Sequence, residues 1–167
     1  SELHRDAPGN SPYEIVLWIP LVDCFKTKAM YLVDYKSTLE LYDDLEKSLD
    51  WVIANNIEKL TILGATGLRE DMTIANHYIL FDYYDKLELK MVTDHQTITC
   101  HKGKRIFSST PGNNVSLFVK NFKTIVSIRN LKYPINNSEL NPSSKAISNQ
   151  SLAEQFEVHS SGPILVF

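Results

Sequence analysis

The spacing of apolar residues is regular in the middle of the chain and predicts alternating helices and strands. Leu45, Leu49 and Val52 recur at the three- to four-residue spacing of an amphipathic helix that begins at Asp43. The segment 59–63 is a short apolar run, typical of a buried strand, and it leads into glycine. The predicted elements are, in order, a helix from Asp43 to Asn55-Asn56, a strand over 59–63, a helix beginning near Asp71 and a strand over 87–93. This alternation is the pattern of a parallel α/β layer.

Beyond residue 94 the pattern changes to short strand-like runs separated by turn residues. The segments 97–101 and 105–108 flank Lys102-Gly103-Lys104, and this arrangement predicts a hairpin. The polar stretch 136–151 predicts a long loop. Further strands are predicted over 115–119, 122–128, 155–159 and 164–167. Because no helical pattern interrupts these strands, we expect a small antiparallel β-sandwich.

The chain therefore divides into two predicted domains. Residues 1–94 form an α/β, Rossmann-like domain, and residues 95–167 form an all-β, antiparallel sandwich domain. Before the first helix, apolar runs over 13–22 and 30–33 predict two more strands.

Composition narrows the class of protein. The 167 residues are 43% apolar and 22% charged, which suits a globular protein with a hydrophobic core. A net charge of -3 with scattered basic residues argues against nucleic-acid binding, and no apolar run reaches the roughly 20 residues that span a membrane. The first residues lack the pattern of a signal peptide, so we expect a cytoplasmic protein in which Cys24 and Cys100 are reduced thiols.

The strongest candidate for chemistry lies between the 59–63 strand and the second helix. The sequence there is Gly64-Ala-Thr-Gly67-Leu-Arg69-Glu-Asp71. Glycines at this place let backbone N–H groups approach phosphate, and the following helix adds the positive end of its dipole. Arg69 is suited to grip phosphate through two hydrogen bonds, and Asp71 to bind Mg²⁺. The alternative is an ordinary glycine turn, a surface arginine and a helix cap, because short glycine motifs are not specific.

Acidic residues also open the first helix. Asp43 is explained by helix capping, whereas Asp44 is a candidate for a metal or phosphate site that faces the glycine loop. Lys47, one turn later, is a candidate phosphate ligand, although charged residues in a first turn are usually solvated. The histidines show no spacing of a zinc site or a catalytic triad.

Several motifs in order along the chain resemble the thiamin pyrophosphokinase family. The segment from Asp43 to Lys47 resembles a helix start in that family, and Gly64 to Thr73 resembles its Gly-Ala-x-Gly-Gly-Arg-x-Asp-His-Thr loop. The motifs Pro111-Gly112, Leu131-Lys-Tyr-Pro134 and Ile147-Ser148-Asn149-Gln150, and the final strand from Gly162, resemble segments of its sandwich domain. The resemblance runs from Asp43 to Phe167 and rests on the order of the motifs rather than on one of them.

This resemblance implies an activity and a set of site residues. The family transfers the pyrophosphoryl group of ATP to the hydroxyl of thiamin, releases AMP and requires Mg²⁺; it forms homodimers with thiamin in clefts between subunits. The implied catalytic residues are Arg69, Asp71 and Asp44; the implied ATP ligands are Lys47, Gly64, Thr66, Gly67 and Arg69; the implied thiamin ligands are Ser148 and Asn149; and the implied metal ligands are Asp34, Asp44 and Asp71.

The N-terminal part departs from the family pattern. Only 43 residues precede Asp44, and Val33-Asp34-Tyr35-Lys36-Ser37 has a lysine where the family has a second metal-binding aspartate. An ammonium group cannot bind a metal ion. Metal binding is lost, or this part is arranged differently, or the sequence is a piece of a longer chain. The prediction is therefore an active thiamin pyrophosphokinase, and the alternative is a degenerate, non-catalytic relative that binds thiamin or thiamin diphosphate.

Overall fold

The structure is a computed structural model that describes residues 45–63, 65–66, 70–140 and 145–167. The strands predicted over 13–22 and 30–33 lie outside the described residues, as do Asp34 and Asp44.

The alternating elements predicted for the middle of the chain are confirmed. They are α2 (Leu45–Ala54), β1 (Lys59–Leu63), α3 (Glu70–Tyr83) and β2 (Glu88–Val92). β1 and β2 pair in parallel from Lys59↔Glu88 to Leu63↔Val92, and α3 makes the crossover between them. The bounds of β1 and β2 and the start of α3 lie within one residue of the prediction, whereas the predicted helix start at Asp43 lies outside the described residues.

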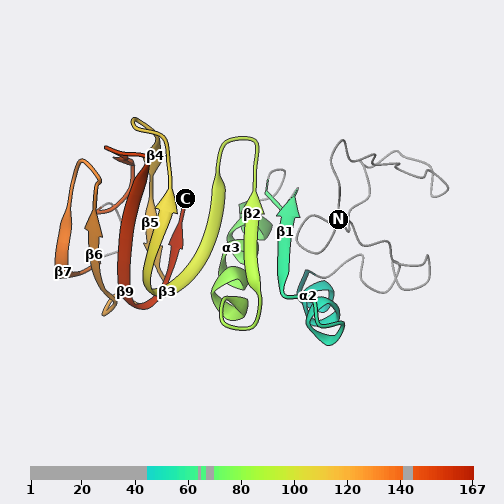
Figure 1. The fold of residues 1–167 in the computed structure, drawn as a ribbon. Coiled ribbons are helices and arrows are strands. Elements are labelled where there is room, and N and C mark those ends of the chain that lie inside the picture. Colours follow the sequence, from blue (N-terminus) through green and yellow to red (C-terminus); the bar gives the residue numbers. More distant parts are fainter. Residues whose placement is uncertain (1–44, 64, 67–69, 141–144) are drawn as a thin grey trace.

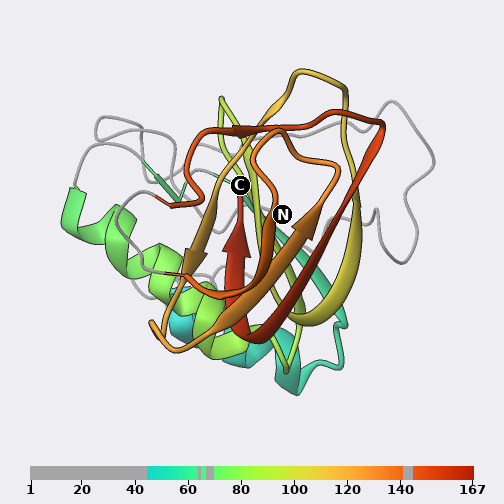
Figure 2. The ribbon, with the colours of Figure 1, turned by 90° about the vertical axis from the view of Figure 1, so that its left-hand side faces the viewer.

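The helices are held on the sheet by a shared apolar core. Leu49 and Val52 of α2 are buried together with Leu80 of α3 and Met91 of β2. The hydroxyl of Tyr83 donates a hydrogen bond of 2.8 Å to Oδ1 of Asp50, which ties the end of α3 to α2. Seen from the side in Figure 2, α3 lies beside the strands. The core thus fixes the helix that follows the glycine loop.

The second half of the chain is almost entirely β structure. Its strands are β3 (Thr97–Ser108), β4 (Asn114–Val115), β5 (Leu117–Val119), β6 (Ile125–Arg129), β7 (Ile135–Glu139), β8 (Asn149–Gln150) and β9 (Gln155–Val166). The main sheet has the order β1-β2-β3-β9-β6-β7, with β5 also paired to β9, and β4 pairs with β8 in a separate two-stranded sheet. Every strand pair other than β1 and β2 is antiparallel, so the main sheet is mixed.

The predicted hairpin around Gly103 is wrong. β3 is one strand of 12 residues, and both of its halves pair with β9. The register shifts between His101 and Gly103, and Gly103 has a φ of 85°, a left-handed conformation that glycine adopts readily. The lysines and glycine that suggested a turn therefore belong to a continuous strand, and the extra residues at the register shift are on β9, where 161–163 lie opposite Lys102.

Three other strand predictions are corrected. The runs predicted over 155–159 and 164–167 are parts of the single strand β9. The run predicted over 115–119 is divided at Ser116 into β4 and β5. The stretch 136–151, which was predicted to be a loop, contains β8 and all of β7 except its first residue, Ile135. Ile135 is buried, whereas Asn136 and Asn137 are exposed. β7 is the last strand of the sheet and is joined to it by backbone pairing with β6.

The buried apolar residues form two hydrophobic clusters. One contains α2, α3, β1 and β2, and the other contains β4 to β7 with most of β9. β3 joins them, because Thr97–Thr99 pair with β2 while Thr99 and the residues after it pair with β9. A domain boundary at residue 94 stays a prediction.

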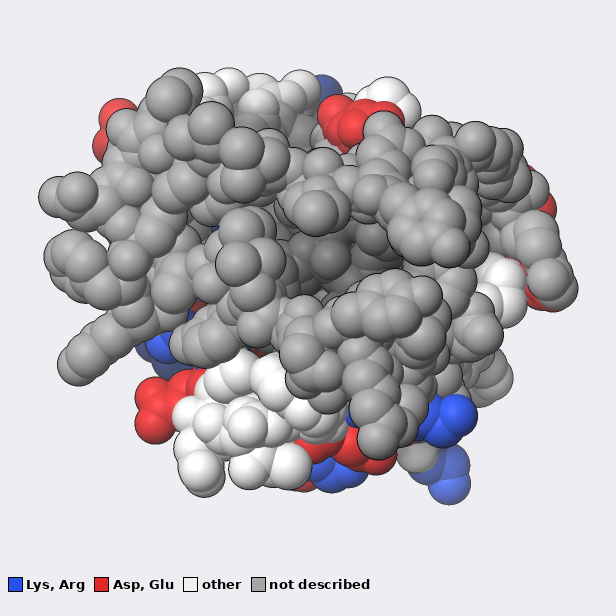
Figure 3. Space-filling view, turned by 90° about the vertical axis from the view of Figure 1, so that its right-hand side faces the viewer, with Lys and Arg blue, Asp and Glu red and all other residues white. Residues whose placement is uncertain are grey.

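Figure 3 shows one face of the molecule, on which described acidic and basic side chains lie next to each other. In the part of the chain that the structure describes, no helix has the length and apolar character needed to cross a membrane.

Candidate functional site

The glycine loop lies where the parallel strand β1 ends and α3 begins. Of its residues the structure describes Ala65 and Thr66, both partly buried. The side-chain amide Nδ2 of Asn76 donates a hydrogen bond of 2.8 Å to the carbonyl oxygen of Ala65. This bond spans 11 positions of the chain and holds Ala65 against the second turn of α3. Ala65 and Thr66 therefore lie at the carboxyl edge of β1, where open α/β sheets bind their ligands.

Asp71 lies in the first turn of α3 and is exposed to solvent. Its neighbour Glu70 is also exposed, so two carboxylates stand at the positive end of the helix dipole. The dipole stabilises these carboxylates without a ligand, and it also favours any phosphate bound at the preceding loop. Thr66 and Asp71 are thus brought to the same edge of the sheet.

The other predicted ATP and metal residues are less informative. Lys47 is exposed in the first turn of α2. Gly64, Gly67 and Arg69 lie outside the described residues, together with Asp34 and Asp44. Within the described ranges no group of three or more His, Cys, Asp or Glu side chains is placed to hold a metal ion. Asp71 is the one proposed metal ligand whose position can be given.

The two predicted thiamin residues differ in what their side chains do. Ser148 is exposed, has a φ of 56° and donates its backbone N–H to Oγ of Ser116 at 3.0 Å. Asn149, by contrast, is only 3% exposed and lies in β8, opposite Val115 of β4. The Ser148 hydroxyl is therefore open to a ligand, whereas the Asn149 amide is enclosed.

The amide of Asn149 is occupied by the protein itself. Its Oδ1 accepts hydrogen bonds from the backbone N–H groups of Tyr133 and Gln150, both at 2.9 Å. Its Nδ2 donates to the carbonyl oxygen of Tyr133 at 2.7 Å. The two bonds with Tyr133 clamp its backbone to β8, and the third lies within β8. The geometry gives Asn149 a positioning role for the segment that carries Ser148.

Two residues that shape these regions are missing from the sequence prediction. Asn76 holds the glycine loop, and Ser116 anchors the backbone of Ser148. Asn76 could have been noticed in the sequence, because asparagine is unfavourable in the interior of a helix and its side-chain amide tends to bond to the backbone instead. Ser116 gave no signal, because its partner is 32 positions away.

The glycine loop and the Ser148 region lie apart within one chain. In Figure 1 the end of β1 and the strand β4 are separated by β2 and β3. The two regions also belong to different hydrophobic clusters, since Ala65 packs against one and Val115 belongs to the other.

The fold is similar to that of several solved structures. The chain superposes with a TM-score of 0.65 on thiamine pyrophosphokinase from Bacillus subtilis, at 20% identity over 74% of this chain and 61% of that one. The TM-score is 0.63 with a thiamin pyrophosphokinase family protein from Enterococcus faecalis, at 21% identity over 74% and 62% of the two chains. It is 0.61 with thiamin pyrophosphokinase from Candida albicans, at 21% identity over 77% and 50%. The chain has the thiamin pyrophosphokinase fold.

The likeness to thiamin pyrophosphokinases is one of structure. The chain spans 61% of the length of the Bacillus subtilis protein and 50% of the Candida albicans protein. No protein-family model matches the sequence, and no curated protein sequence matches it. The resemblance of motifs is thus supported by the fold that carries them.

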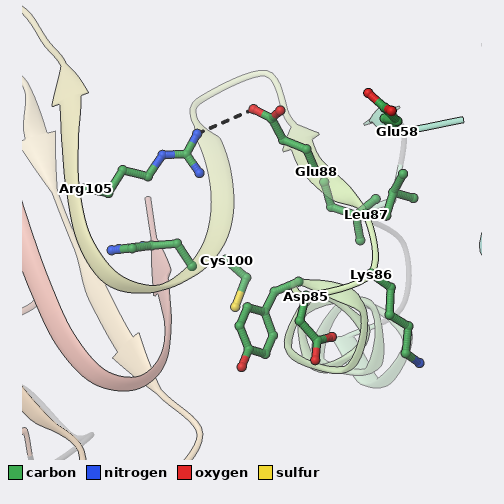
Figure 4. A pocket seen from close by; sticks show the side chains of 10 residues that line it. Glu58, Asp85, Lys86, Leu87, Glu88, Cys100 and Arg105 are labelled. Atoms are coloured by element: carbon green, nitrogen blue, oxygen red, sulfur yellow. Dashed lines mark ion pairs between the residues drawn. The ribbon is translucent and has the colours of Figure 1, made fainter.

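The chain's thiamin pyrophosphokinase fold also has a pocket at the opposite edge of the sheet. This cavity of about 320 Å³ lies at the start of β2 and the end of α3. Its lining residues are Glu58, Tyr84, Asp85, Lys86, Leu87, Glu88, Leu89, Cys100, His101 and Arg105. In Figure 4 the Arg105 side chain points across the pocket to Glu88, and the two form an ion pair of 3.6 Å.

Burial controls the ionisable groups of β3 in this pocket. Burial lowers the pKa of His101 to about 4, and the charge of Arg105 lowers it further. Burial also raises the pKa of the Cys100 thiol to about 12. A hydrogen bond from Lys59 lowers the pKa of Glu88. At neutral pH the pocket therefore contains an uncharged imidazole, an uncharged thiol and an ionised carboxylate.

Proposed function

We propose that this protein transfers the pyrophosphoryl group of ATP to the hydroxyl of thiamin, giving thiamin diphosphate and AMP. The observation that carries the proposal is the position of Thr66 and Asp71 at the carboxyl edge of β1, on a fold shared with thiamin pyrophosphokinases. The finer division into a Rossmann-like domain and a β-sandwich belongs to the same proposal. A homodimer also belongs to it, because the glycine loop and Ser148 lie apart in one chain and a second copy would bring them together.

The residues of the glycine loop would bind ATP. Backbone N–H groups at Gly64, Thr66 and Gly67 suit phosphate oxygens, and Arg69 and Lys47 add positive charge. Pyrophosphoryl transfer depends on positioning and on neutralising phosphate charge, so such a loop supplies much of what the reaction requires. Its tether through Asn76 would keep these groups in position.

Asp71 would bind Mg²⁺ together with Asp34 and Asp44. Its carboxylate lies in an exposed residue, and hard divalent cations prefer carboxylate oxygens. Mg²⁺, when bound, would neutralise negative charge on the transferred group. Asp71 itself would orient the ion relative to the loop.

Ser148 would contact thiamin on the sandwich side. Its hydroxyl is exposed, while Asn149 holds the backbone of the same segment through three hydrogen bonds. Ser148→Ala is therefore expected to raise the KM for thiamin with a small effect on kcat. An unchanged KM would count against this contact.

The deciding experiment is the formation of AMP from ATP and Mg²⁺ by the purified protein, with and without thiamin. AMP formation that depends on thiamin supports the proposal. Asp71→Asn should lower this turnover at least about tenfold, the change produced by ~1.4 kcal/mol of transition-state stabilisation. Glu70→Gln is the matched control, because it removes a carboxylate from the same helix turn and has the same effect on the dipole. Equal rates in the two variants would remove Asp71 from the mechanism.

A second candidate function is a non-catalytic protein that binds thiamin or its diphosphate. The observation that favours it is Lys36, which occupies the position of a second metal-binding aspartate. For this candidate, thiamin would raise the melting temperature while no AMP is formed.

A further inference from the structure

The side chain of Asn76 is bonded to the peptide group that joins Ala65 and Thr66. Its Nδ2 lies 2.8 Å from the carbonyl oxygen of Ala65, and because a carbonyl oxygen can only accept, the amide acts there as the donor. The bond is partly buried and links residues 11 positions apart. It ties the backbone just after β1 to the second turn of α3.

Both partners of this hydrogen bond are anchored in the hydrophobic core. Leu80, one turn after Asn76 on α3, is fully buried. The ring of His77, the residue next to Asn76, stacks on the ring of Phe167 with 5.5 Å between centroids. Ala65 packs against the same hydrophobic cluster that contains Leu80. The Asn76 amide therefore meets the Ala65 carbonyl from a support that is itself held in place.

The hydrogen bond fixes a direction as well as a position, because a peptide group is planar. The described residues contain no cis peptide bond, and in a trans peptide the C=O and the N–H that follows it point in opposite directions. The carbonyl of Ala65 and the N–H of Thr66 belong to one such plane. Since the carbonyl is turned toward Asn76, the Thr66 N–H is turned away from it. In the described part of the chain, no backbone carbonyl accepts this N–H.

We propose that Asn76 is a positioning residue that aims the Thr66 N–H at a phosphate oxygen of ATP. This inference rests on the function proposed above, in which Thr66 is one of the phosphate donors. Hydrogen bonds weaken steeply as the donor turns away from its acceptor, so the orientation of the peptide plane controls what the Thr66 N–H contributes. A direction that is set before the nucleotide arrives also lowers the entropy lost on binding. Asn76 acts through the Ala65 carbonyl and does not itself contact ATP.

Two variants of Asn76 and one matched control test this role. Asn76→Ala removes the donor, and alanine is well tolerated inside a helix. Asn76→Asp keeps the size of the side chain but places an ionised oxygen, which cannot donate, against the Ala65 carbonyl. The control is Asn55→Ala. Nδ2 of Asn55 donates to the carbonyl oxygen of Trp51, also at 2.8 Å, but Asn55 lies between α2 and β1, at the opposite end of β1 from Thr66.

The first measurement is isothermal titration calorimetry of the full chain with ATP and Mg²⁺, in the absence of thiamin. Each Asn76 variant should bind ATP at least about fivefold more weakly than the wild type, because a hydrogen bond to a charged phosphate loses its alignment. Asn55→Ala should bind ATP as tightly as the wild type. Urea denaturation of the same variants separates stability from binding. If the Asn76 variants are less stable but bind ATP as tightly as the wild type, Asn76 is only structural and the proposal is overturned.

Thiamin-dependent AMP formation by the same variants separates this inference from the proposed function. The Asn76 variants should raise the KM for ATP at least about fivefold and leave the KM for thiamin unchanged. AMP formation with an unchanged KM for ATP would overturn the role of Asn76 and leave the proposed function standing. ATP affinity that depends on Asn76, without any AMP formation, would support the role of Asn76 and refute pyrophosphoryl transfer. Absence of ATP binding by the wild type would overturn both.

Discussion

Replacing Asn149 with alanine measures how much its buried amide contributes to the stability of the β-rich half of the chain. The change removes three hydrogen bonds, two from backbone N–H groups to Oδ1 and one from Nδ2 to the carbonyl of Tyr133. Each hydrogen bond contributes a net ~1 kcal/mol, and a backbone group left unpaired in a buried place costs somewhat more. Because Tyr133 is an exposed residue, water will replace part of the loss. We therefore expect a loss of about 2 to 4 kcal/mol in the free energy of unfolding.

Urea denaturation followed by circular dichroism is the suitable assay. With an m value of roughly 2 kcal/mol/M for a chain of this size, the midpoint should fall by about 1 to 2 M. Ser148→Ala is the matched control at the next residue, and it should change the free energy of unfolding by less than about 0.5 kcal/mol. A midpoint for Asn149→Ala within about 0.25 M of the wild type would refute the clamp, given the same m value.

Asn149→Asp tests whether the side chain at this position must donate a hydrogen bond to the carbonyl oxygen of Tyr133. The Oδ1 acceptor is retained, but an ionised carboxylate oxygen would face the carbonyl of Tyr133 at the place where Nδ2 donates at 2.7 Å. The protonated acid can donate there, so the pKa of the new carboxyl should be raised in the folded state. The variant should then regain stability as the pH falls below that pKa, whereas Asn149→Ala should not.

Three further predictions concern β3. Burial holds the pKa of His101 near 4, against 6.5 for an unburied ring, so between these pH values only the unfolded state binds the proton. The free energy of unfolding of the wild type, measured in urea titrations, should therefore drop by up to about 3 kcal/mol from pH 7 to pH 4. His101→Phe should remove most of this drop. The pKa of the buried Cys100 thiol is near 12, so at pH 8 this thiol should react with a disulfide reagent at least about a hundredfold more slowly in the folded protein than in urea. The rates are measured in a Cys24→Ser background. Equal rates would show that the thiol is accessible in the folded protein. Gly103→Ala meets no atom within 4 Å but must adopt a φ of 85°, so it should cost about 1 to 2 kcal/mol in the free energy of unfolding, while Lys102→Ala next to it should cost less than about 0.5 kcal/mol.

The α/β half could be predicted from sequence because its signals are local. Helical spacing in α2, the apolar run of β1 and the glycine loop each fix a boundary from neighbouring residues. The β half could not be predicted in the same way, since its strands are defined by partners far along the chain. β7 is the clearest case: its pattern is polar apart from Ile135, and its pairing with β6 uses backbone groups. In β3, only the pairing with β9 shows that Gly103 lies within a strand rather than in a turn.

The candidate site, too, could be predicted only where its residues are close together in the sequence. The positions of Thr66 and Asp71 follow from the strand, loop and helix that surround them in sequence. The role of Asn149 depends on the backbone of Tyr133, 16 positions earlier, which only the folded chain brings into contact. His101 also gave no sign of its burial, because a histidine beside Lys102 in an expected turn is normally solvated.

The central position of β9 has a consequence for the order in which the protein can fold during synthesis. β9 pairs with β3, β5 and β6, and all three precede it in the sequence. Until the ribosome has released residues 155–166, these strands lack the partner that lies between them and present open edges to other chains. The elements α2 to β2 have their partners within one short segment and can assemble earlier. The growing chain is therefore most exposed to aggregation, and most in need of chaperones, in the interval between the synthesis of β3 and that of β9.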